Sequence, residues 1–187
     1  MRLVPLDVAG AFAIEAETIR DERGWFARCW DAQVLAAAGL VDRFTQQSAA
    51  WNERAGTLRG LHVARTPAVE VKIVRCVRGA VLDVIVDVRP ESPTFGRHAA
   101  VHLDEGTRRC LYVPAGCAHG YQTLVDATEL AYDISEPYRV DLAGGVAHDD
   151  PALSIAWPLG VVALSARDAG LPTLEVYVAA LATEAVR

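Results

Sequence analysis

The sequence predicts an all-β fold, an antiparallel β-sandwich or β-barrel with a few short peripheral helices. Short runs rich in Val, Ile, Phe and Tyr recur from about residue 11 to residue 134, and each has the length of a β-strand. Turn-forming clusters such as N-E-R-A-G (52–56) and R-P-E-S-P-T-F-G (89–96) separate these runs. Many short strands with few helices are typical of antiparallel sandwiches and barrels.

The expected strands follow one another along the chain, and no internal repeat or low-complexity segment interrupts them. They cover residues 11–17, 24–30, 44–52, 57–63, 69–77, 80–88, 97–103, 109–116, 118–124 and 128–135. After Tyr138 the chain becomes irregular, and D-D-P (149–151) and W-P (157–158) mark turns there.

Two helices are expected at the periphery. Asp31 is a capping residue before A-Q-V-L-A-A-A (32–38), and Gly39 ends that short helix. The segment 172–186, P-T-L-E-V-Y-V-A-A-L-A-T-E-A-V, is expected to form a C-terminal helix with Pro172 in its first turn.

Strand alternation places polar and apolar residues on the same face. Glu70, Lys72, Val74 and Cys76 share one face of their strand because side chains alternate between the two faces of a sheet. Such a mixed face suits a barrel whose interior is partly a pocket.

Arg59 and His62 belong to the motif G-T-L-R-G-L-H (56–62) and point to opposite faces in a regular strand. Both reach one pocket only if the ladder is locally distorted. Gly60 lies between them, and glycine inside a strand often marks a bulge.

Size and composition indicate a single globular domain over residues 1–187, with 52% apolar and 22% charged residues. No run approaches the roughly 18 apolar residues of a membrane span, and the first ten residues lack the features of a secretory signal. Four scattered cysteines without a C-x-x-C pair are expected to be reduced thiols of a cytoplasmic protein. The net charge of −6 argues against nucleic acid as a partner.

Lys72 is the only lysine among 18 basic residues, and it stands in the middle of an expected strand. Lysine carries a compact point charge, whereas the arginine guanidinium is a planar fork. We interpret position 72 as one that requires the ammonium group. The alternative is that this lysine is retained by chance.

The histidines do not form a metal-binding pattern. Ala64 stands two residues after His62, so a His-x-His pair is missing, and His98 and His102 have the neighbours of surface or structural histidines. Nucleophile-elbow and phosphate-loop motifs are also absent from the sequence. We therefore expect neither a metal nor another cofactor.

Proton transfer is the chemistry that remains. A single histidine in a pocket is the usual general base near neutral pH, a carboxylate orients it, and a lysine stabilises a developing oxyanion. His62, Lys72, Tyr132 and a carboxylate would together suit abstraction of a proton next to a carbonyl, although residue types alone do not assemble them in space. Asp83 and Asp87 are expected to serve as structural ion-pair or turn-anchoring groups.

A series of motifs in one order resembles the dTDP-4-dehydrorhamnose 3,5-epimerase family, which comprises metal-free sugar-nucleotide epimerases of the cupin fold. The resemblance extends from about residue 5 to residue 175. The motifs are D-E-R-G (21–24), G-T-L-R-G-L-H (56–62), V-K-I-V-R-C-V-R-G (71–79), L-D-V-I-V-D-V-R (82–89), S-P-T-F-G (92–96), V-P-A-G-C-A-H-G-Y (113–121), Tyr132, Tyr138, D-D-P (149–151), I-A-W-P (155–158) and L-S-A-R-D (164–168). It implies a cupin-type jelly roll and epimerisation of a nucleoside diphosphate 4-keto-6-deoxyhexose at C3, C5 or both.

The resemblance implies four catalytic roles. His62 matches the general base of the family, and Asp168 matches the carboxylate paired with that base. Lys72 matches the cation near the 4-keto oxygen, and Tyr132 matches the acid on the opposite face of the sugar ring.

The resemblance also implies substrate-binding residues. Arg23 and Arg59 match arginines that engage the substrate, particularly its diphosphate, and His119, Tyr138 and Gln46 match pocket positions. The family is dimeric with strands exchanged between subunits, so we expect a homodimer in which one pocket draws on both chains.

The sequence departs from the family pattern at several positions, some of which belong to the part that binds the nucleotide. Ser48 replaces an Asn and Arg167 replaces a Lys, and we keep both among the expected substrate-binding residues. Arg28 stands in place of a Glu, Ala143 in place of a carboxylate, and His148 in place of a Trp. The resemblance therefore supports the type of reaction better than the identity of the nucleotide base or of the exact sugar.

Two other functions stay open at this stage. One is a mono-epimerase that acts at C3 or C5 alone, with a 3,4-ketoisomerase as a more distant relative. The other is a catalytically silent cupin that binds a sugar nucleotide. Retention of all four catalytic residue types argues against the silent protein, because binding alone does not require a base and an acid.

Overall fold

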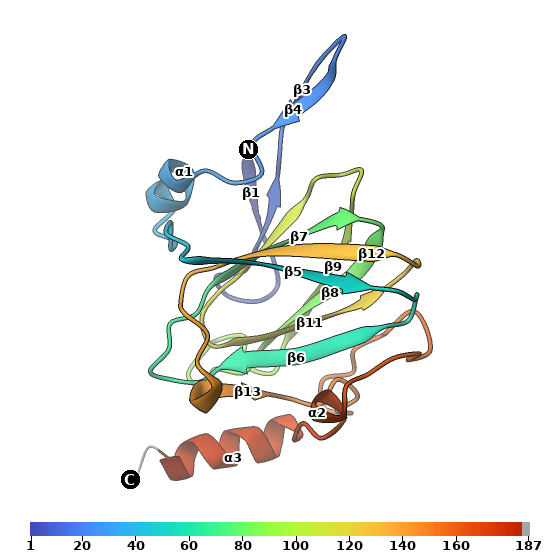
Figure 1. Cartoon of the computed structure of the whole chain (residues 1–187). Helices are drawn as coiled ribbons and strands as arrows, with labels where there is room; N and C mark the ends of the chain where they lie inside the picture. The colour runs from blue at the N-terminus through green and yellow to red at the C-terminus, as the bar shows by residue number, and fades with distance from the viewer. Residues whose placement is uncertain (185–187) are drawn as a thin grey trace.

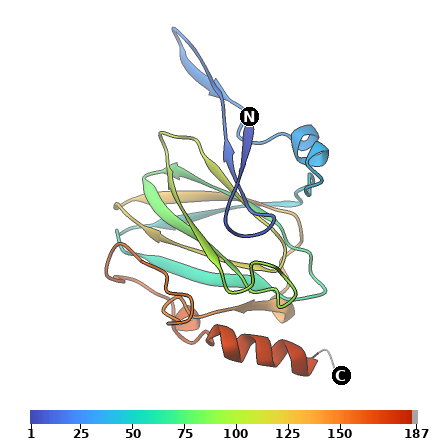
Figure 2. The ribbon, with the colours of Figure 1, turned by 180° about the vertical axis from the view of Figure 1, so that it is seen from behind.

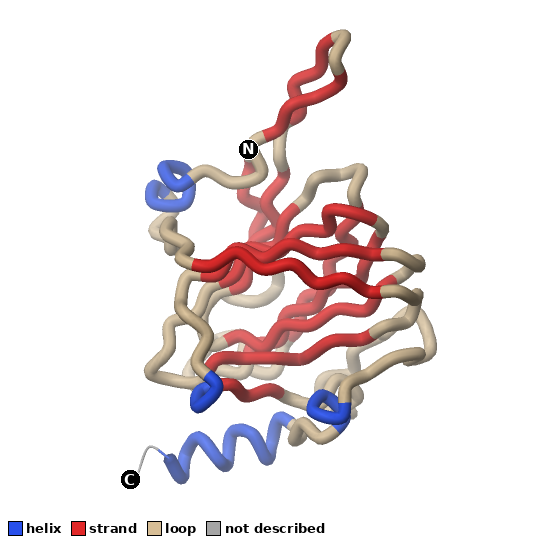
Figure 3. The backbone as a smooth tube through the Cα atoms, viewed as in Figure 1, coloured by secondary structure: helices blue, strands red, loops and turns tan. Residues whose placement is uncertain are grey.

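Two antiparallel β-sheets face each other in the computed structural model, which describes residues 1–184 (Figures 1 and 3). One sheet has six strands in the order β1-β2-β10-β7-β12-β5, and the other has five in the order β13-β6-β11-β8-β9. The all-β class predicted from the sequence is confirmed, and the arrangement is that of a sandwich.

The strands of these sheets are short and follow the predicted runs. They are β1 (Arg2–Pro5), β2 (Phe12–Glu15), β5 (Gln46–Asn52), β6 (Leu58–Ala64), β7 (Lys72–Arg78), β8 (Ala80–Asp87), β9 (His98–Asp104), β10 (Cys110–Val113), β11 (Cys117–Thr123), β12 (Thr128–Ile134) and β13 (Ala143–Gly145). A separate hairpin and four helical segments complete the described residues: β3 (Thr18–Asp21), β4 (Gly24–Ala27), α1 (Ala32–Ala37), η1 (Val140–Leu142), α2 (Ala166–Ala169) and α3 (Leu174–Glu184).

The main core lies between the two sheets. Val74 and Cys76 of β7 pack there with Ile85 of β8 and Leu103 of β9. Lys72 alternates in register with Val74 and Cys76, so it lies on the inner face of its strand, as predicted. The strand thus supplies core residues at one end and a charged group at the other.

Each sheet also buries part of its outer face. Leu61 and Val63 of β6 pack with Leu174 and Tyr177 of α3, which runs beside the five-stranded sheet (Figures 1 and 2). On the other side, Leu35 of α1 belongs to a second outer cluster. The outer faces are covered only in part, since most residues of the edge strand β5 are exposed.

The hairpin β3–β4 extends away from the sandwich (Figures 1 and 3). Its apolar side chains are exposed: Ile19 by 69% and Phe26 by 64%. Apolar side chains gathered on a projecting element indicate a contact surface, because exposed apolar patches usually mark an interaction site.

Every predicted strand overlaps an observed one, and the helix after Asp31 is confirmed. The Asp31 carboxylate accepts a hydrogen bond from Gln33 N at 2.9 Å, and Gly39 follows the helix with φ of +71°. The C-terminal helix begins at Leu174, so the prediction that Pro172 lies in its first turn was wrong. Thr173 caps the helix instead, with its hydroxyl 3.4 Å from Val176 N, and the last two residues predicted helical lie outside the described residues.

Five short elements were not predicted: β1, β3, η1, β13 and α2. β13 has the sequence A-G-G, which has little strand propensity, and it is a strand because it pairs with β6. None of the helices in residues 1–184 has the length and hydrophobicity needed to span a bilayer.

Candidate active site

His62 and Asp168 form a hydrogen-bonded pair although 106 positions separate them in sequence. His62 lies on β6, and its Nε2 is 2.7 Å from Asp168 Oδ1. The other carboxylate oxygen accepts a hydrogen bond from Gly60 N–H at 3.1 Å. Asp168 belongs to α2, and its own N–H donates to the Ser165 hydroxyl at 3.0 Å. The helix cap and the strand backbone together hold this carboxylate against the imidazole.

The electrostatics of this pair suit a proton acceptor. Burial lowers the pKa of His62 below its usual value, and the hydrogen bond to Asp168 opposes that shift only in part. Burial acts to raise the pKa of Asp168, but hydrogen bonds from His62 and Gly60 N–H outweigh it, and the pKa is lowered. Near neutral pH the carboxylate is therefore ionised and the imidazole neutral. An ionised carboxylate only accepts hydrogen bonds, so the imidazole proton resides on Nε2 and Nδ1 is the basic nitrogen.

A bulge brings Arg59 and His62 to the same cavity. His119 of β11 pairs with His62, whereas Tyr121 pairs with Arg59, so two residues of β6 stand opposite one of β11. Gly60 takes φ of +119°, and a Cβ there would lie 2.6 Å from Gly120 Cα. Only glycine fits this close approach between the strands. This is the local distortion that the sequence predicted.

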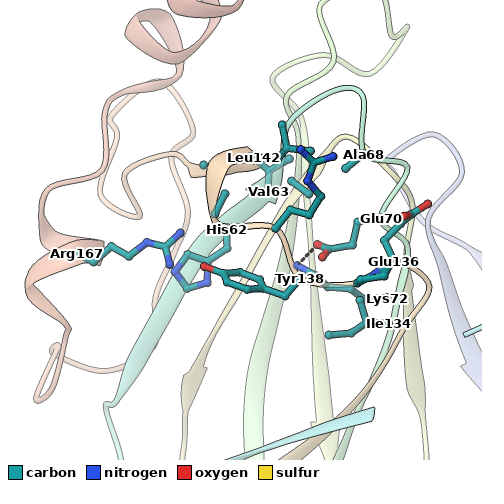
Figure 4. Close-up of a pocket in the computed structure, with 15 residues that line it drawn as sticks. His62, Val63, Ala68, Glu70, Lys72, Ile134, Glu136, Tyr138, Leu142 and Arg167 are labelled. Carbon is teal, nitrogen blue, oxygen red and sulfur yellow. Dashed lines mark ion pairs between the residues drawn. The ribbon is translucent and has the colours of Figure 1, made fainter. Parts of the chain in front are cut away.

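Lys72 approaches from the opposite sheet. It begins β7, and its Nζ forms an ion pair with Glu70 at 3.0 Å (Figure 4). Both side chains are mostly buried. His62 and Lys72 line two cavities in common, so the imidazole and the ammonium group face the same space.

Tyr132 and His119 close one of these shared cavities. Tyr132 comes from β12 and His119 from β11, and their rings meet edge to face with centroids 6.2 Å apart. His119 Nε2 is 2.7 Å from Asp83 Oδ1. Burial raises the pKa of Asp83, and its Oδ2 has no hydrogen-bond partner among the described residues.

Burial also raises the pKa of Tyr132 well above its usual value. The tyrosine therefore carries its proton at neutral pH. A protonated tyrosine facing a basic histidine across a cavity provides an acid and a base on two sides of one space.

Tyr138 and Arg167 line the outer part of the site. Figure 4 shows both side chains pointing toward His62. The Tyr138 backbone N–H donates to the Gln46 side chain at 3.0 Å, and Ser48 of β5 lines the cavity that holds Tyr132 and Lys72. Tyr138, Arg167 and Ser48 thus border cavities that His62 lines, and Gln46 is linked to them through Tyr138.

Arg23 does not join them within one chain. It lies in the turn of the hairpin β3–β4, where its guanidinium pairs with Asp21 at 2.5 Å and is exposed to solvent. Arg28, at the base of the hairpin, pairs with Asp31 at 3.0 Å. Neither arginine lines a cavity that includes His62.

Within residues 1–184, no three side chains of His, Cys, Asp or Glu are grouped as a metal site would require. His98 lies on β9, and His102 is 3.3 Å from Asp104 on that strand. Asp87 accepts hydrogen bonds from Arg89, Ser92 and Thr94, which agrees with the predicted turn-anchoring role.

Sequence reasoning missed some residues of the site. Asp83 was expected to be a structural ion-pair group, and it does pair with His119, which lines the cavity. Tyr121 also lines the cavity, and a hydrogen bond of 3.2 Å joins it to Asn52, which is buried next to it. A buried Asn at a strand end was the available signal, because buried polar groups are almost always hydrogen-bonded to something specific.

Comparison with known proteins agrees with this arrangement. The model of the family described as dTDP-4-dehydrorhamnose 3,5-epimerase matches residues 5–176. A dTDP-4-dehydrorhamnose 3,5-epimerase from Mycobacterium tuberculosis is 40% identical over 180 residues, which are 94% of this chain and 88% of that protein.

Two solved structures are similar throughout. A 4-keto-6-deoxy sugar epimerase from the novobiocin biosynthetic gene cluster of Streptomyces spheroides has a TM-score of 0.91 at 37% identity, covering 96% of this chain and 90% of that one. A 3'-monoepimerase from Streptomyces bikiniensis, in complex with dTDP-quinovose, has a TM-score of 0.85 at 37% identity, covering 91% and 87%.

Proposed function

Because this chain belongs to the dTDP-4-dehydrorhamnose 3,5-epimerase family, we propose that it inverts C3, C5 or both in a nucleoside diphosphate 4-keto-6-deoxyhexose. It is an isomerase, and its substrate is a nucleotide sugar. The observation that carries this proposal is the single cavity in which His62 of one sheet faces Lys72 and Tyr132 of the other.

His62 is the general base. The 4-keto group acidifies the hydrogens on C3 and C5, and the neutral imidazole accepts one of them. Asp168 fixes the ring and stabilises the imidazolium that forms. A positioned base contributes roughly 10²–10⁴-fold to the rate.

Lys72 stabilises the enolate. Negative charge moves to the C4 oxygen as the proton leaves, and the ammonium group lies in the same partly buried space as the imidazole. A charge preorganised in such a site is worth on the order of 3 kcal/mol.

Tyr132 completes inversion. It returns a proton to the carbon from the face opposite His62, because the two side chains come from opposing sheets. The proton on the inverted carbon comes from the tyrosine hydroxyl, and the abstracted proton leaves on the imidazole.

The substrate-binding residues surround this centre. Arg59 and Arg167 border a common cavity with His62, and guanidinium groups suit a diphosphate. Tyr138, Gln46, Ser48 and His119 bind the remaining parts of the nucleotide sugar. The relatives named for dTDP sugars support dTDP as the nucleotide.

We propose that the protein is a homodimer with strand exchange. The apolar hairpin β3–β4 is exposed in one chain, and docking on a second copy would bury it. Arg23 would then reach the substrate of the partner. The cytoplasmic location expected from the sequence stays a prediction.

A mono-epimerase is the second candidate function. The similarity to a 3'-monoepimerase favours it, since that protein is 37% identical to this chain. A silent sugar-nucleotide-binding cupin is the third, and the acid–base pair in the cavity argues against it.

Incubation with dTDP-4-keto-6-deoxyglucose in D₂O, followed by NMR, tests the proposal. We expect deuterium at C3, C5 or both, with inverted product. Label at both carbons identifies a double epimerase, and label at one identifies a mono-epimerase. Absence of label at either carbon would contradict epimerisation of this substrate.

A further inference from the structure

A buried chain of hydrogen bonds runs from Tyr121 to Arg59, and Tyr132 adjoins its Tyr121 end. Tyr132 and Tyr121 line the same cavity, and each side chain influences the pKa of the other. The Tyr121 hydroxyl donates to Asn52 Oδ1 at 3.2 Å. Arg59 Nε donates to the same oxygen at 2.9 Å. Arg59, Asn52 and Tyr121 thus form one chain, and Tyr132 lies beside it in the same cavity wall as Tyr121.

Asn52 holds the centre of this chain in one orientation. Its side-chain amide donates to Thr128 O at 3.2 Å and to Ala50 O at 3.3 Å. Asn52 is 2% exposed, so water does not compete for these bonds. The carboxamide oxygen is therefore fixed toward Tyr121 and Arg59, because the opposite orientation would place it against two carbonyl oxygens and turn the NH2 group toward the Arg59 donor.

We propose that Tyr121 and Asn52 are positioning residues that orient the Tyr132 hydroxyl and the Arg59 guanidinium as one unit. This inference rests on the proposed function, in which Tyr132 is the acid and Arg59 binds the diphosphate. It assigns a role to Tyr121 in the wall of the cavity and to Asn52, which is buried next to it. Their effect is to fix the distance between the substrate diphosphate, which Arg59 binds, and the proton donor Tyr132.

Tyr121 also supports the proton transfer itself. When Tyr132 gives its proton to the substrate carbon, the new C–H bond forms and a phenolate remains. The Tyr121 hydroxyl, which donates to Asn52 in the resting state, turns to donate to that phenolate. Asn52 Oδ1 still accepts from Arg59, so no buried polar group is left unpaired. A proton from water then restores the Tyr132 hydroxyl.

The other groups around Tyr132 do not all stabilise its phenolate, so a hydroxyl that donates to the phenolate matters. The ring of His119 packs against Tyr132, and Asp83 lies close enough to disfavour a phenolate, whereas Arg59 favours it. Lys72 and Ser48 face the same cavity. Tyr121 lines this cavity beside Tyr132 and is 1% exposed.

The test is a double-mutant cycle on Tyr121→Phe and Tyr132→Phe. Tyr121→Phe removes one hydroxyl, and we expect kcat for inversion to fall about tenfold while KM stays within about twofold. Deuterium exchange from D₂O should persist, so the ratio of exchange to inverted product should rise. In the Tyr132→Phe background, the second substitution should cost nothing further, because its effect passes through Tyr132.

Tyr112→Phe is the matched control. Its hydroxyl accepts a hydrogen bond from Val41 N at 2.9 Å on the outer side of the six-stranded sheet, away from these cavities. We expect this variant to keep kcat and its exchange ratio. Asn52→Ala should raise KM about tenfold as well as lower kcat, because both ends of the chain lose their anchor. If Asn52→Ala does not fold, the double-mutant cycle on Tyr121→Phe and Tyr132→Phe tests the inference by itself.

Two outcomes would overturn the inference. Tyr121→Phe could leave kcat and the exchange ratio of the wild type, or its cost could persist undiminished in the Tyr132→Phe background. Both leave the proposed function intact as long as Tyr132→Phe itself abolishes inversion. Full inversion by Tyr132→Phe alone would instead remove the proposed acid, and the positioning role with it.

Discussion

His62 has the surroundings of a proton acceptor. Its Nε2 is bound by a carboxylate that is itself held by a backbone N–H and by a capped helical turn. The ring faces a cavity shared with a cation and a phenol. Such an imidazole keeps Nδ1 as its basic nitrogen and can remove a proton from a substrate.

The pH dependence of the reaction should report the His62 pair. Burial lowers the pKa of His62 and Asp168 raises it, so Asp168→Asn removes the opposing influence and the pKa should fall further. We expect the acid limb of kcat/KM to move to lower pH, while the plateau falls on the order of 10²–10⁴-fold because the weaker base is also poorly oriented. A wild-type pH profile in Asp168→Asn would exclude the pairing.

The identity of the cation at position 72 is a second prediction at this scale. In Lys72→Arg, the planar guanidinium should form a two-pronged pair with Glu70 and turn away from the enolate oxygen. We expect kcat to fall on the order of 10²-fold, measured by product NMR. Arg78→Lys, at the exposed end of the same strand, is the control that should keep its activity. Full activity of Lys72→Arg would contradict a requirement for the ammonium group.

At the scale of elements, the bulge in β6 decides which side chains meet. A regular strand would direct Arg59 and His62 to opposite faces, and the extra residue places both at one cavity. The same distortion exposes Gly60 N–H to the Asp168 carboxylate. Gly60 thus helps to position His62, its partner Asp168 and Arg59.

Gly60→Ala should destabilise the fold and the site together. The added Cβ would meet Gly120 Cα at 2.6 Å and His119 O at 2.8 Å, at a φ of +119°. We expect a loss of roughly 1–3 kcal/mol in the free energy of unfolding, measured by urea denaturation. Gly24→Ala is a matched control, because Gly24 has φ of +129° but no atom within 4 Å of its added Cβ. An equal cost in the two variants would show that the close approach of β6 and β11 is unimportant.

At the scale of the whole molecule, one chain places Arg23 outside its own candidate site. The residue lies at the tip of the hairpin β3–β4, which extends away from the sandwich in Figures 1 and 3. The exposed side chains of Ile19 and Phe26 accompany it. A second copy that covers the hairpin would bury this apolar surface and bring Arg23 to the partner's cavity.

Subunit complementation tests this arrangement. His62→Ala and Arg23→Ala chains are each expected to have low activity, and light scattering should show each to be a dimer. In mixed dimers, one cavity would combine an intact His62 with an intact Arg23 from the other chain. We expect co-expression to restore activity toward about one quarter of the wild-type sites. Mixtures no more active than the separate variants would place Arg23 outside the partner's site.

The sequence by itself determined the class of fold, the strands that build it and the type of chemistry. Alternating and β-branched runs between turn residues are local signals, so every predicted strand overlaps an observed one. The bulge at Gly60 was also readable locally, because glycine inside a strand has few other uses. Motif order indicated the family, and the comparisons confirm it.

Only the tertiary structure decided which residues meet. Asp168 and His62 are far apart in sequence, and no local pattern measures the distance between two such groups. β13 exists because β6 offers it a partner. Asn52 and Tyr121 come from opposite sheets and meet across the sandwich, and Asp83 meets His119 of the neighbouring strand β11. The physical reason is that propensity acts between neighbours in sequence, whereas a site is made where distant strands come to lie a few ångströms apart.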